Sequence, residues 1–249
     1  MLTRSIIKYI QSLQHKKFRD EHNSFIAEGL KVVNEFIKDN QFDCKNIYAT
    51  SEWINLYANN LPLIRGKIIE VKDFELEKIA LFSSPNMVLA EFRKKVIKAQ
   101  INYQHKITLV LDDIQDPGNF GTMIRTADWF GIENIICSGQ TVDMYNPKVV
   151  QSTMASLGRI NIEYIDLAKE LKKNSLIKKF AATLNGHKLE DISPLKEGFI
   201  IIGNESKGIS KALLEMADIK FTIPGYGTAE SLNAAVATGI ILYSIVRNS

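Results

Sequence analysis

The stretch FIIIGNESKGIS, residues 199–210, joins four apolar residues directly to a run of small and polar ones. A short apolar run that ends in glycine is typical of a buried strand that stops at the edge of a sheet. Gly203 and Gly208 permit backbone conformations that other residues avoid. The loop therefore either brings its backbone close to a ligand or turns into the next helix, and these residues alone leave both interpretations open.

Five further apolar runs occur in the second half of the chain. They are ITLVLD (107–112), NIICSG (134–139), INIEYI (160–165), KFAATL (179–184) and IKFTI (219–223). Because helix-compatible stretches separate them, they predict a parallel sheet with helices on both faces, that is, an α/β fold. Ligands of such sheets bind at the carboxyl ends of the strands. The loops DDIQDPGNFG, NGHK, GNESKG and PGYGTAES are therefore candidates for the site.

Charge and glycine content divide the chain near residue 106. Residues 1–106 contain 17 Lys and Arg against 12 Asp and Glu, a net charge of +5, whereas residues 107–249 contain 14 against 16, a net charge of −2. Twelve of the 14 glycines lie after residue 106. We expect a small mixed α/β domain at 1–95, a linker at 96–106 and the parallel-sheet domain at 107–249. The positive first domain indicates either a solvated surface or contact with nucleic acid.

Several protein classes are disfavoured by what the sequence lacks. Cys44 and Cys137 are far apart and the four histidines are scattered, which indicates a reducing compartment, no disulfide and no metal site. The first residues lack the roughly 7–15-residue apolar core of a signal peptide, and AAVATGIILYSIV is shorter than the roughly 18 residues of a membrane span. No GxGxxG or GxxxxGK[ST] loop occurs, and the spacing around Ser206 is one residue too long for a hydrolase nucleophile elbow.

Two loops besides GNESKG combine amides, glycines and charged or hydroxyl side chains. In DPGNFGTMIRTADWFG, Arg125 lies near the start of a helix that follows Asn119, a position that suits a bound phosphate. The alternative is that Asn119 only caps the helix and Arg125 pairs with Asp128. In IPGYGTAESLNAAVATG, Ser231 either caps or begins a small-residue helix, expected to run to Val246, that suits close packing in a core or a dimer.

The segments NFGTMIRTADWFGI, IIGNESKGIS and IPGYGTAESLNAAVATGIILY resemble, in order and spacing, the three motifs of the SpoU (TrmH-like) branch of the SPOUT RNA methyltransferases. The segment YNPKVVQSTMASLGRI resembles the connection between the first two motifs, although Gln151 stands where relatives often have a basic residue. QSLQHKKFRDEHNSFIAEGLKVVNEFI resembles the ribosomal-protein-like RNA-binding domain that many members carry at the N-terminus.

This resemblance implies the fold and the reaction. It implies a deep trefoil knot in the C-terminal domain and S-adenosylmethionine as the methyl donor. It further implies methyl transfer to a ribose 2′-hydroxyl of structured RNA by a homodimer, with ribosomal RNA favoured over tRNA. The two separated cysteines add the expectation of a cytoplasmic location.

The resemblance also implies the residues of the site. Arg125 would orient the nucleotide and stabilise the developing alkoxide, and whether this arginine or a substrate phosphate takes the proton stays open. Its polar partners would be Asn119, Glu205, Ser231 and Asn233. The cofactor would contact Gly203, Ile223 and Leu232, with Leu184 and Asn185 as neighbours.

Two other functions compete with this one. A non-catalytic RNA-binding descendant of the family would have little need for Asn119, Arg125, Glu205, Ser231 and Asn233 together. A methyltransferase for small molecules would not explain the basic first domain.

Overall fold

The computed structural model describes the 249-residue chain except for residues 58–63, 65, 83–86, 96–100, 193 and 247–249. The chain forms two compact units. Unit 1 consists of Met1–Val96 and Asp143–Gly158, and unit 2 consists of Ile97–Val142 and Arg159–Ser249. The expected linker 96–106 lies partly outside the described residues. The segment Asp143–Gly158, which we expected in the second domain, is part of unit 1.

Unit 1 contains a four-stranded mixed sheet in the order β1-β4-β2-β3. The strands are β1 (Ser24–Glu28), β2 (Cys44–Ala49), β3 (Ile68–Glu70) and β4 (Val88–Arg93). β4 runs antiparallel to β1 and β2, whereas β2 and β3 are parallel. The first residues of β1, β2 and β3 and the last residue of β4 therefore lie at the same end of this sheet.

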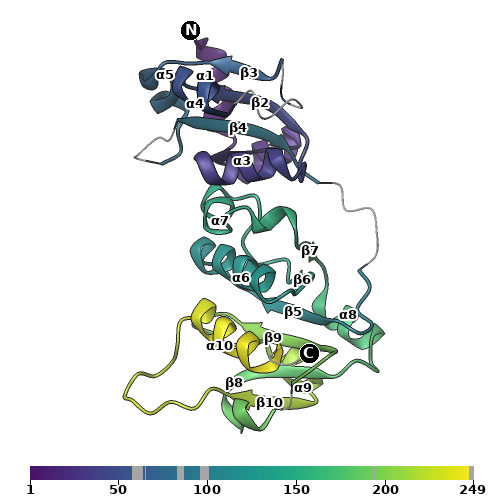
Figure 1. Ribbon diagram of the computed structural model, residues 1–249. Helices are drawn as coiled ribbons and strands as arrows, with labels where there is room; N and C mark the ends of the chain where they lie inside the picture. The colour runs from purple at the N-terminus through teal and green to yellow at the C-terminus, as the bar shows by residue number, and fades with distance from the viewer. Residues whose placement is uncertain (58–63, 65, 83–86, 96–100, 193, 247–249) are drawn as a thin grey trace. The chain divides into compact units, whose positions relative to one another are not determined.

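Helices cover both faces of the sheet of unit 1 (Figure 1). They are α1 (Arg4–Ser12), α2 (Lys16–His22), α3 (Leu30–Lys38), α4 (Ser51–Tyr57), α5 (Asp73–Ile79) and α7 (Pro147–Ser152). Successive side chains of a strand point to opposite faces of a sheet. Ile26 of β1 and Leu89 of β4 consequently pack against Ile10 of α1, whereas their neighbours point towards α3.

An aromatic cluster fills the face of the sheet that α3 covers. Between ring centroids, Phe25 of β1 lies 6.2 Å from Phe36 of α3 and 5.7 Å from Phe92 of β4. Tyr145 joins the cluster with its ring 4.8 Å from Phe25. Aromatic pairs in such geometries each contribute roughly 0.5–1.5 kcal/mol beyond the burial of their surface. The ring of Tyr145 is thus one reason why Asp143–Gly158 packs in unit 1.

A buried ion pair attaches the same segment a second time. Arg19 of α2, only 2% exposed, donates to Asp143 at 2.6 Å. Its remaining N–H groups donate to the carbonyl oxygens of Leu13 and Gln14 at 3.0 and 2.7 Å. A buried guanidinium that lost its carboxylate would be an unpaired charge in the protein interior, so Asp143 is held firmly in place.

Unit 2 contains a six-stranded sheet in the order β10-β8-β9-β5-β6-β7, in which every pair is parallel. The strands are β5 (Ile107–Asp112), β6 (Asn134–Cys137), β7 (Asn161–Tyr164), β8 (Lys179–Lys188), β9 (Gly198–Gly203) and β10 (Ile219–Thr222). All six lie at the predicted apolar runs, and the predicted α/β fold is confirmed. β5 and β9 are the central strands, which explains their continuous apolar sequence.

The helices of unit 2 form two groups. They are α6 (Pro117–Trp129), α8 (Leu167–Lys173), α9 (Lys211–Met216) and α10 (Ala234–Val246). α6 packs against α10, and α8 against α9. Val110 and Ile201 of the sheet pack into one cluster with Leu171 of α8 and Leu213 of α9. The alternate residues of β5 and β9 are also buried, as a sheet covered on both faces requires.

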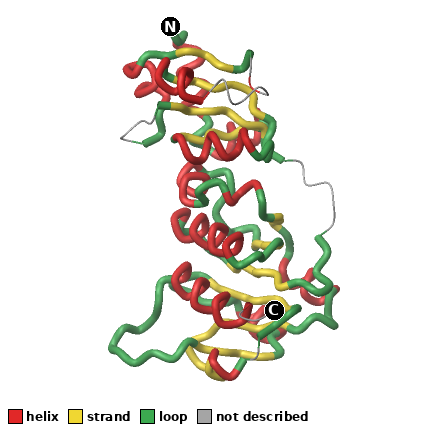
Figure 2. The backbone as a smooth tube through the Cα atoms, in the orientation of Figure 1, coloured by secondary structure: helices red, strands yellow, loops and turns green. Residues whose placement is uncertain are grey.

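The connection between β10 and α10 is a long loop that extends away from the sheet (Figure 2). It contains the sequence PGYGTAESLN (224–233), and most of its residues are exposed. The trefoil knot implied by the resemblance stays a prediction. No helix within the described ranges is long and apolar enough to cross a membrane.

Candidate functional site

The first component of the site is the start of α6. Asp116 precedes the helix, and its carboxylate accepts the backbone N–H of Asn119 at 2.7 Å. Pro117 occupies the first helical position, where the missing N–H costs nothing. The sequence alternative in which Asn119 caps this helix is therefore wrong. Asp116 is the cap, and the side chain of Asn119 is left to reach other loops.

The second component is the loop after β9. Asn204, only 8% exposed, accepts the backbone N–H groups of Ser206 and Lys207 at 2.9 and 3.0 Å. Its amide nitrogen donates to the carbonyl oxygen of Asp113, 2.8 Å away. The loop closes with paired backbone bonds between Asn204 and Gly208. These bonds fix the loop so that the intervening Glu205 points outward.

Gly203 at the start of this loop is required by a close backbone approach. A Cβ atom at this position would lie 2.3 Å from the carbonyl carbon of Gly208 and 2.3 Å from the nitrogen of Ile209. Real Cβ atoms essentially never come closer than 3.0 Å. The glycine is thus needed for the loop itself, whatever ligand its backbone meets.

The third component is the start of α10. Asn233 accepts the N–H groups of Ala235 and Val236 at 3.0 and 3.2 Å, so Asn233 caps this helix. The helix begins at Ala234, and the alternative in which Ser231 caps it is wrong. Ser231 is exposed and forms no hydrogen bond with any residue of the described ranges.

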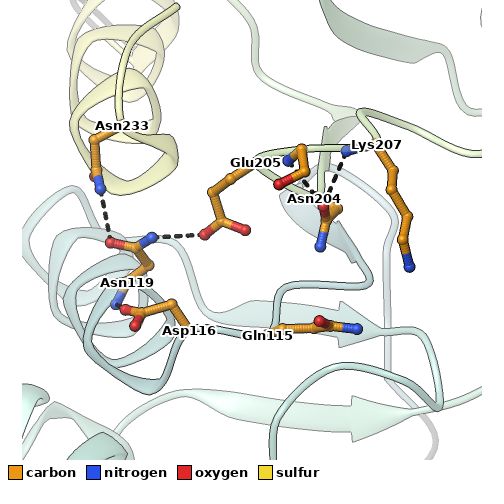
Figure 3. A pocket seen from close by; sticks show the side chains of 8 residues that line it. Gln115, Asp116, Asn119, Asn204, Glu205, Lys207 and Asn233 are labelled. Carbon is orange, nitrogen blue, oxygen red and sulfur yellow. Dashed lines mark hydrogen bonds between the residues drawn. The ribbon is translucent and has the colours of Figure 1, made fainter.

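Side chains from the three components form one hydrogen-bonded chain (Figure 3). Asn119 donates from Nδ2 to Glu205 Oε1 at 2.6 Å, and Asn233 donates from Nδ2 to Asn119 Oδ1 at 2.9 Å. Both functional atoms of the Asn119 amide are occupied, so its orientation is fixed. Three of the predicted polar partners, far apart in sequence, therefore meet at one place.

An open pocket of about 550 Å³ adjoins this chain of side chains. Its lining is entirely polar and consists of Gln115, Asp116, Asn119, Asn204, Glu205, Ser206, Lys207 and Asn233. The ammonium of Lys207 lies 3.1 Å from the carboxylate of Asp113. Sequence reasoning assigned no role to Asn204, Lys207 or Gln115. The position of Asn204 inside the quoted motif was the available signal, but its partner Asp113 lies 91 positions away.

Arg125 lies on α6 with its side chain exposed. The sequence alternative in which it pairs with Asp128 is wrong, because Asp128 accepts the Nε of Arg159 at 2.8 Å. Within the part of the chain that the structure describes, Arg125 has no hydrogen-bond or ion-pair partner. It does not line the pocket. It remains an uncompensated cation on the helix that carries Asn119.

None of the residues predicted to contact the cofactor lines this first pocket. Leu184 is 71% exposed and Leu232 is 49% exposed. Ile223 follows β10 and is half-buried. Asn185 lines a second pocket of about 490 Å³, between β8 and β10, together with His187 and Asp218.

Comparison with known proteins places these observations in a family context. A family model described as the SpoU rRNA methylase family matches residues 106–243, and a model described as the MRM3-like substrate binding domain matches residues 4–90. A 23S rRNA (guanosine(2553)-2′-O)-methyltransferase, RlmP of Bacillus subtilis strain 168, is 32% identical over 253 residues, which cover 96% of this chain and 95% of the relative.

Two solved structures resemble the fold along the whole chain. A protein of the TrmH family from Porphyromonas gingivalis has a TM-score of 0.87 and 30% identity, with 100% of both chains covered. An rRNA methyltransferase from Sinorhizobium meliloti, solved with S-adenosylmethionine bound, has a TM-score of 0.86 and 32% identity, with 99% of this chain and 96% of that chain covered.

Proposed function

This chain belongs to the SpoU rRNA methylase family, and on that basis we propose that it transfers a methyl group from S-adenosylmethionine to a ribose 2′-hydroxyl of ribosomal RNA. The observation that carries the proposal is the chain of hydrogen bonds that joins Asn119, Glu205 and Asn233. These residues come from the three segments that carry the family motifs. The B. subtilis relative acts on 23S rRNA, and tRNA is the alternative substrate.

S-adenosylmethionine is the cosubstrate, and it supplies a methyl group activated by a positively charged sulfur. The open pocket beside the loop after β9 has a volume within the roughly 300–1,000 Å³ of sites for small molecules. Its amide and carboxylate lining offers partners for ribose hydroxyl and amino groups. Gly203, Asn185, Leu184, Ile223 and Leu232 do not line this pocket. We propose that they contribute the apolar part of cofactor binding, because the exposed side chains of Leu184 and Leu232 present surface that an adenine ring can cover.

The reaction needs a ribose hydroxyl that has lost, or is losing, its proton. A 2′-hydroxyl is a weak nucleophile, so a nearby group must hold it in line with the methyl group and offset the negative charge that develops on oxygen. We assign this role to Arg125, whose guanidinium stays protonated and binds phosphate with two parallel hydrogen bonds. S-adenosylmethionine would supply the methyl group to the 2′-oxygen and would leave as S-adenosylhomocysteine, and the hydroxyl proton would pass to a substrate phosphate or to water.

The remaining polar residues position this step. Glu205 fixes the amide of Asn119 at 2.6 Å, and Asn233 fixes it from the other side. We propose that Asn119 and Asn233 hold the nucleotide, and that Ser231, which is exposed in the loop before α10, binds the same phosphate as Arg125.

Two further properties belong to the same proposal. α10 exposes an apolar face that includes Val236 and Ile240, and we propose that a second copy of the chain covers it in a homodimer. We also propose a cytoplasmic location, which two free buried cysteines, Cys44 and Cys137, support.

The test compares Arg125→Ala with Arg125→Lys and with Lys172→Ala, a matched exposed cation elsewhere in unit 2. Transfer of tritium from labelled S-adenosylmethionine to ribosomal RNA should be lost in Arg125→Ala and strongly reduced in Arg125→Lys, since lysine cannot bind phosphate in bidentate fashion. Cofactor affinity by calorimetry should be unchanged, and Lys172→Ala should behave as the unmodified protein. Normal turnover of Arg125→Ala would remove Arg125 from the mechanism, and absence of transfer by the unmodified protein to ribosomal RNA would overturn the rRNA assignment.

A further inference from the structure

The two ends of the sheet in unit 1 carry opposite charge. At one end, which we name the basic end, β1, β2 and β3 begin and β4 finishes. At the opposite end these strands pass into α3, α4 and α5. The segments that leave the strands there, residues 28–33, 49–54 and 70–79, contain six carboxylates and three lysines. A polyanion approaching unit 1 is therefore repelled at the opposite end and attracted at the basic end.

Within the described residues, five cations at the basic end form ion pairs, and they share three carboxylates. The cations are Lys16, Lys45, Lys67, Arg93 and Lys94, and the carboxylates are Asp20, Asp43 and Glu91. Asp20 lies between Lys16 and Lys94, at 2.6 and 2.5 Å. Asp43 lies between Lys67 and Arg93, at 3.3 Å from each. These paired cations exceed their carboxylates by two positive charges.

Sharing of a carboxylate gives these cations defined positions without neutralising them. The side chains of Lys67 and Arg93 remain 37% and 53% exposed while both contact Asp43. A cation that is already held in place loses less side-chain entropy when a phosphate binds than a freely moving lysine does. The arrangement thus combines exposed positive charge with prior ordering.

Lys45 is held by the most buried carboxylate of the cluster. Glu91 is fully buried and accepts hydrogen bonds from Tyr9 at 2.5 Å and from Asn46 at 2.9 Å, and Lys45 lies 2.6 Å away. Lys45 also donates to Ser24 at 2.9 Å. Burial of a carboxylate on a sheet is costly unless donors compensate it. Here the result is that the ammonium of Lys45 stands at a fixed place on the basic end.

We infer that the basic end of unit 1 is the surface that binds the phosphate backbone of the RNA substrate. The inference rests on the proposed function, and it assigns phosphate contacts to Lys45, Lys67, Arg93 and Lys94. RNA is the occupant because the two-charge excess lies in the part of the chain that matches a substrate binding domain. The starts of α3 and α5, at the opposite end, lie outside this surface.

The experiment measures binding of an in vitro transcript of 23S rRNA to the full chain, by filter binding, between about 50 and 200 mM KCl. The test variant is Lys67→Gln with Arg93→Gln, which removes two charges and keeps a polar, unbranched side chain at each position. The control is Lys31→Gln with Lys72→Gln, which removes two exposed lysines at the opposite end. The test variant should bind about tenfold more weakly and the control within about twofold. Because each phosphate contact contributes roughly 0.7–0.9 to the slope of log K against log salt, that slope should fall by about 1.4–1.8 in the test variant only.

Equal loss of affinity in the two double variants, or a larger loss in the control, would overturn the assignment of the surface. If thermal melting shows that the double variant is not folded, the single variant Arg93→Gln decides the question. Among the described residues, the Arg93 side chain forms an ion pair with the exposed Asp43 alone. The single variant should then show about half the change in slope. Methyl transfer by the unmodified protein is measured in parallel. Transfer that persists while both double variants bind alike refutes the surface and leaves the proposed function standing.

Discussion

Asn119 donates a hydrogen bond to Glu205 at 2.6 Å, although 86 positions separate the two residues in sequence. One lies in the first turn of α6 and the other at the tip of the loop after β9. The strands that precede them, β5 and β9, are parallel neighbours, so their carboxyl ends meet at the same edge of the sheet. This adjacency is what turns two separate sequence motifs into one site.

The bond predicts different behaviour of Glu205→Gln and Glu205→Ala. Glutamine retains an oxygen that accepts from Asn119, whereas alanine leaves the amide held by Asn233 alone. Misplacement of a positioning group by about 1 Å can lower a rate by about 100-fold, so Glu205→Ala should lower kcat/KM for RNA by about 10- to 100-fold. Glu205→Gln should lower kcat/KM by a clearly smaller factor than Glu205→Ala does. Initial rates of tritium transfer measure both.

The same measurement separates orientation from charge. Equal losses in the two variants would mean that the negative charge of Glu205 matters and its bond to Asn119 does not. Melting curves of both variants serve as the control, because Glu205 is exposed and neither change should alter folding by more than about 0.5 kcal/mol.

Gly203 gives a prediction about the shape of the loop. The added methyl group of Gly203→Ala would meet the backbone of Gly208 and Ile209 at 2.3 Å, so the loop must open. Overpacking of this kind costs about 1–3 kcal/mol. We expect a lower free energy of unfolding in urea and loss of methyl transfer, since Glu205 moves with the loop.

Gly227→Ala is the matched control for this change. A Cβ atom at Gly227 would have no neighbour within 4 Å, and the residue lies in the exposed loop before α10. Its free energy of unfolding should stay within about 0.5 kcal/mol of the unmodified protein. A stable and active Gly203→Ala protein would show that the loop does not need its observed conformation.

The strands and the edge of the site were predictable because they depend on local patterns. Each apolar run marks a buried strand, and the rule that ligands bind at strand ends brings the loop of Asn119 to the loop of Glu205. The caps were less predictable. Asp116 and Asn119 both have side chains that cap helices, and the position of Pro117 in the first turn decides between them. Ser231 and Asn233 likewise both have side chains that can cap a helix, and the hydrogen bonds in the structure show that Asn233 caps α10.

Contacts between distant segments were beyond the sequence. The alternative in which Arg125 pairs with Asp128 is wrong, because Arg159 lies 31 positions from Asp128 and donates to it at 2.8 Å. The placement of Asp143–Gly158 in unit 1 depends on the ring of Tyr145 against Phe25, 120 residues earlier in the chain. No periodicity reports such a partner, because several surfaces can bury one aromatic ring.

Glu91 predicts a pH-dependent effect of Lys45→Met. Burial raises the pKa of Glu91, but the bonds from Lys45, Tyr9 and Asn46 outweigh it and hold the pKa below its usual value. The carboxylate therefore stabilises the fold above the unfolded pKa, and that contribution is lost as the pH falls through the lower, folded pKa. Without Lys45, burial dominates and the folded pKa rises above the unfolded one.

In Lys45→Met, Glu91 therefore destabilises the fold at neutral pH, whereas in the unmodified protein it stabilises the fold. At pH 7 Lys45→Met should be less stable by about 2 kcal/mol, below the ~3–5 kcal/mol of a fully buried pair because the Lys45 side chain is 28% exposed. As the pH falls through the raised pKa, Glu91 takes up a proton and the deficit should shrink. Urea unfolding at pH 7 and near pH 4.5 measures this deficit in stability.

Lys67→Met is the control, since its partner Asp43 is 57% exposed and the pair contributes about 1 kcal/mol or less at either pH. A deficit of Lys45→Met that grows on acidification would contradict this account of Glu91.

The apolar face of α10 predicts the behaviour of the proposed dimer. Val236, Ile240 and Tyr243 follow one another at spacings that place them on one side of the helix, and they are 53%, 40% and 59% exposed. Light scattering of the unmodified protein at micromolar concentration should give the mass of two chains. Ile240→Glu should give one, because a charged group at the centre of an apolar contact loses its hydration without a partner.

A matched variant shows whether this effect belongs to α10. Leu176 is 97% exposed and lies outside that helix, so Leu176→Glu should leave the dimer intact. If both variants remain dimeric, another surface joins the chains. A monomeric unmodified protein would remove the homodimer from the proposal, and the exposed face of α10 would then need a different explanation.

Methyl transfer by monomeric Ile240→Glu shows whether the site needs both chains. Loss of activity in a folded monomer would mean that residues of the second chain complete the site beside Asn119.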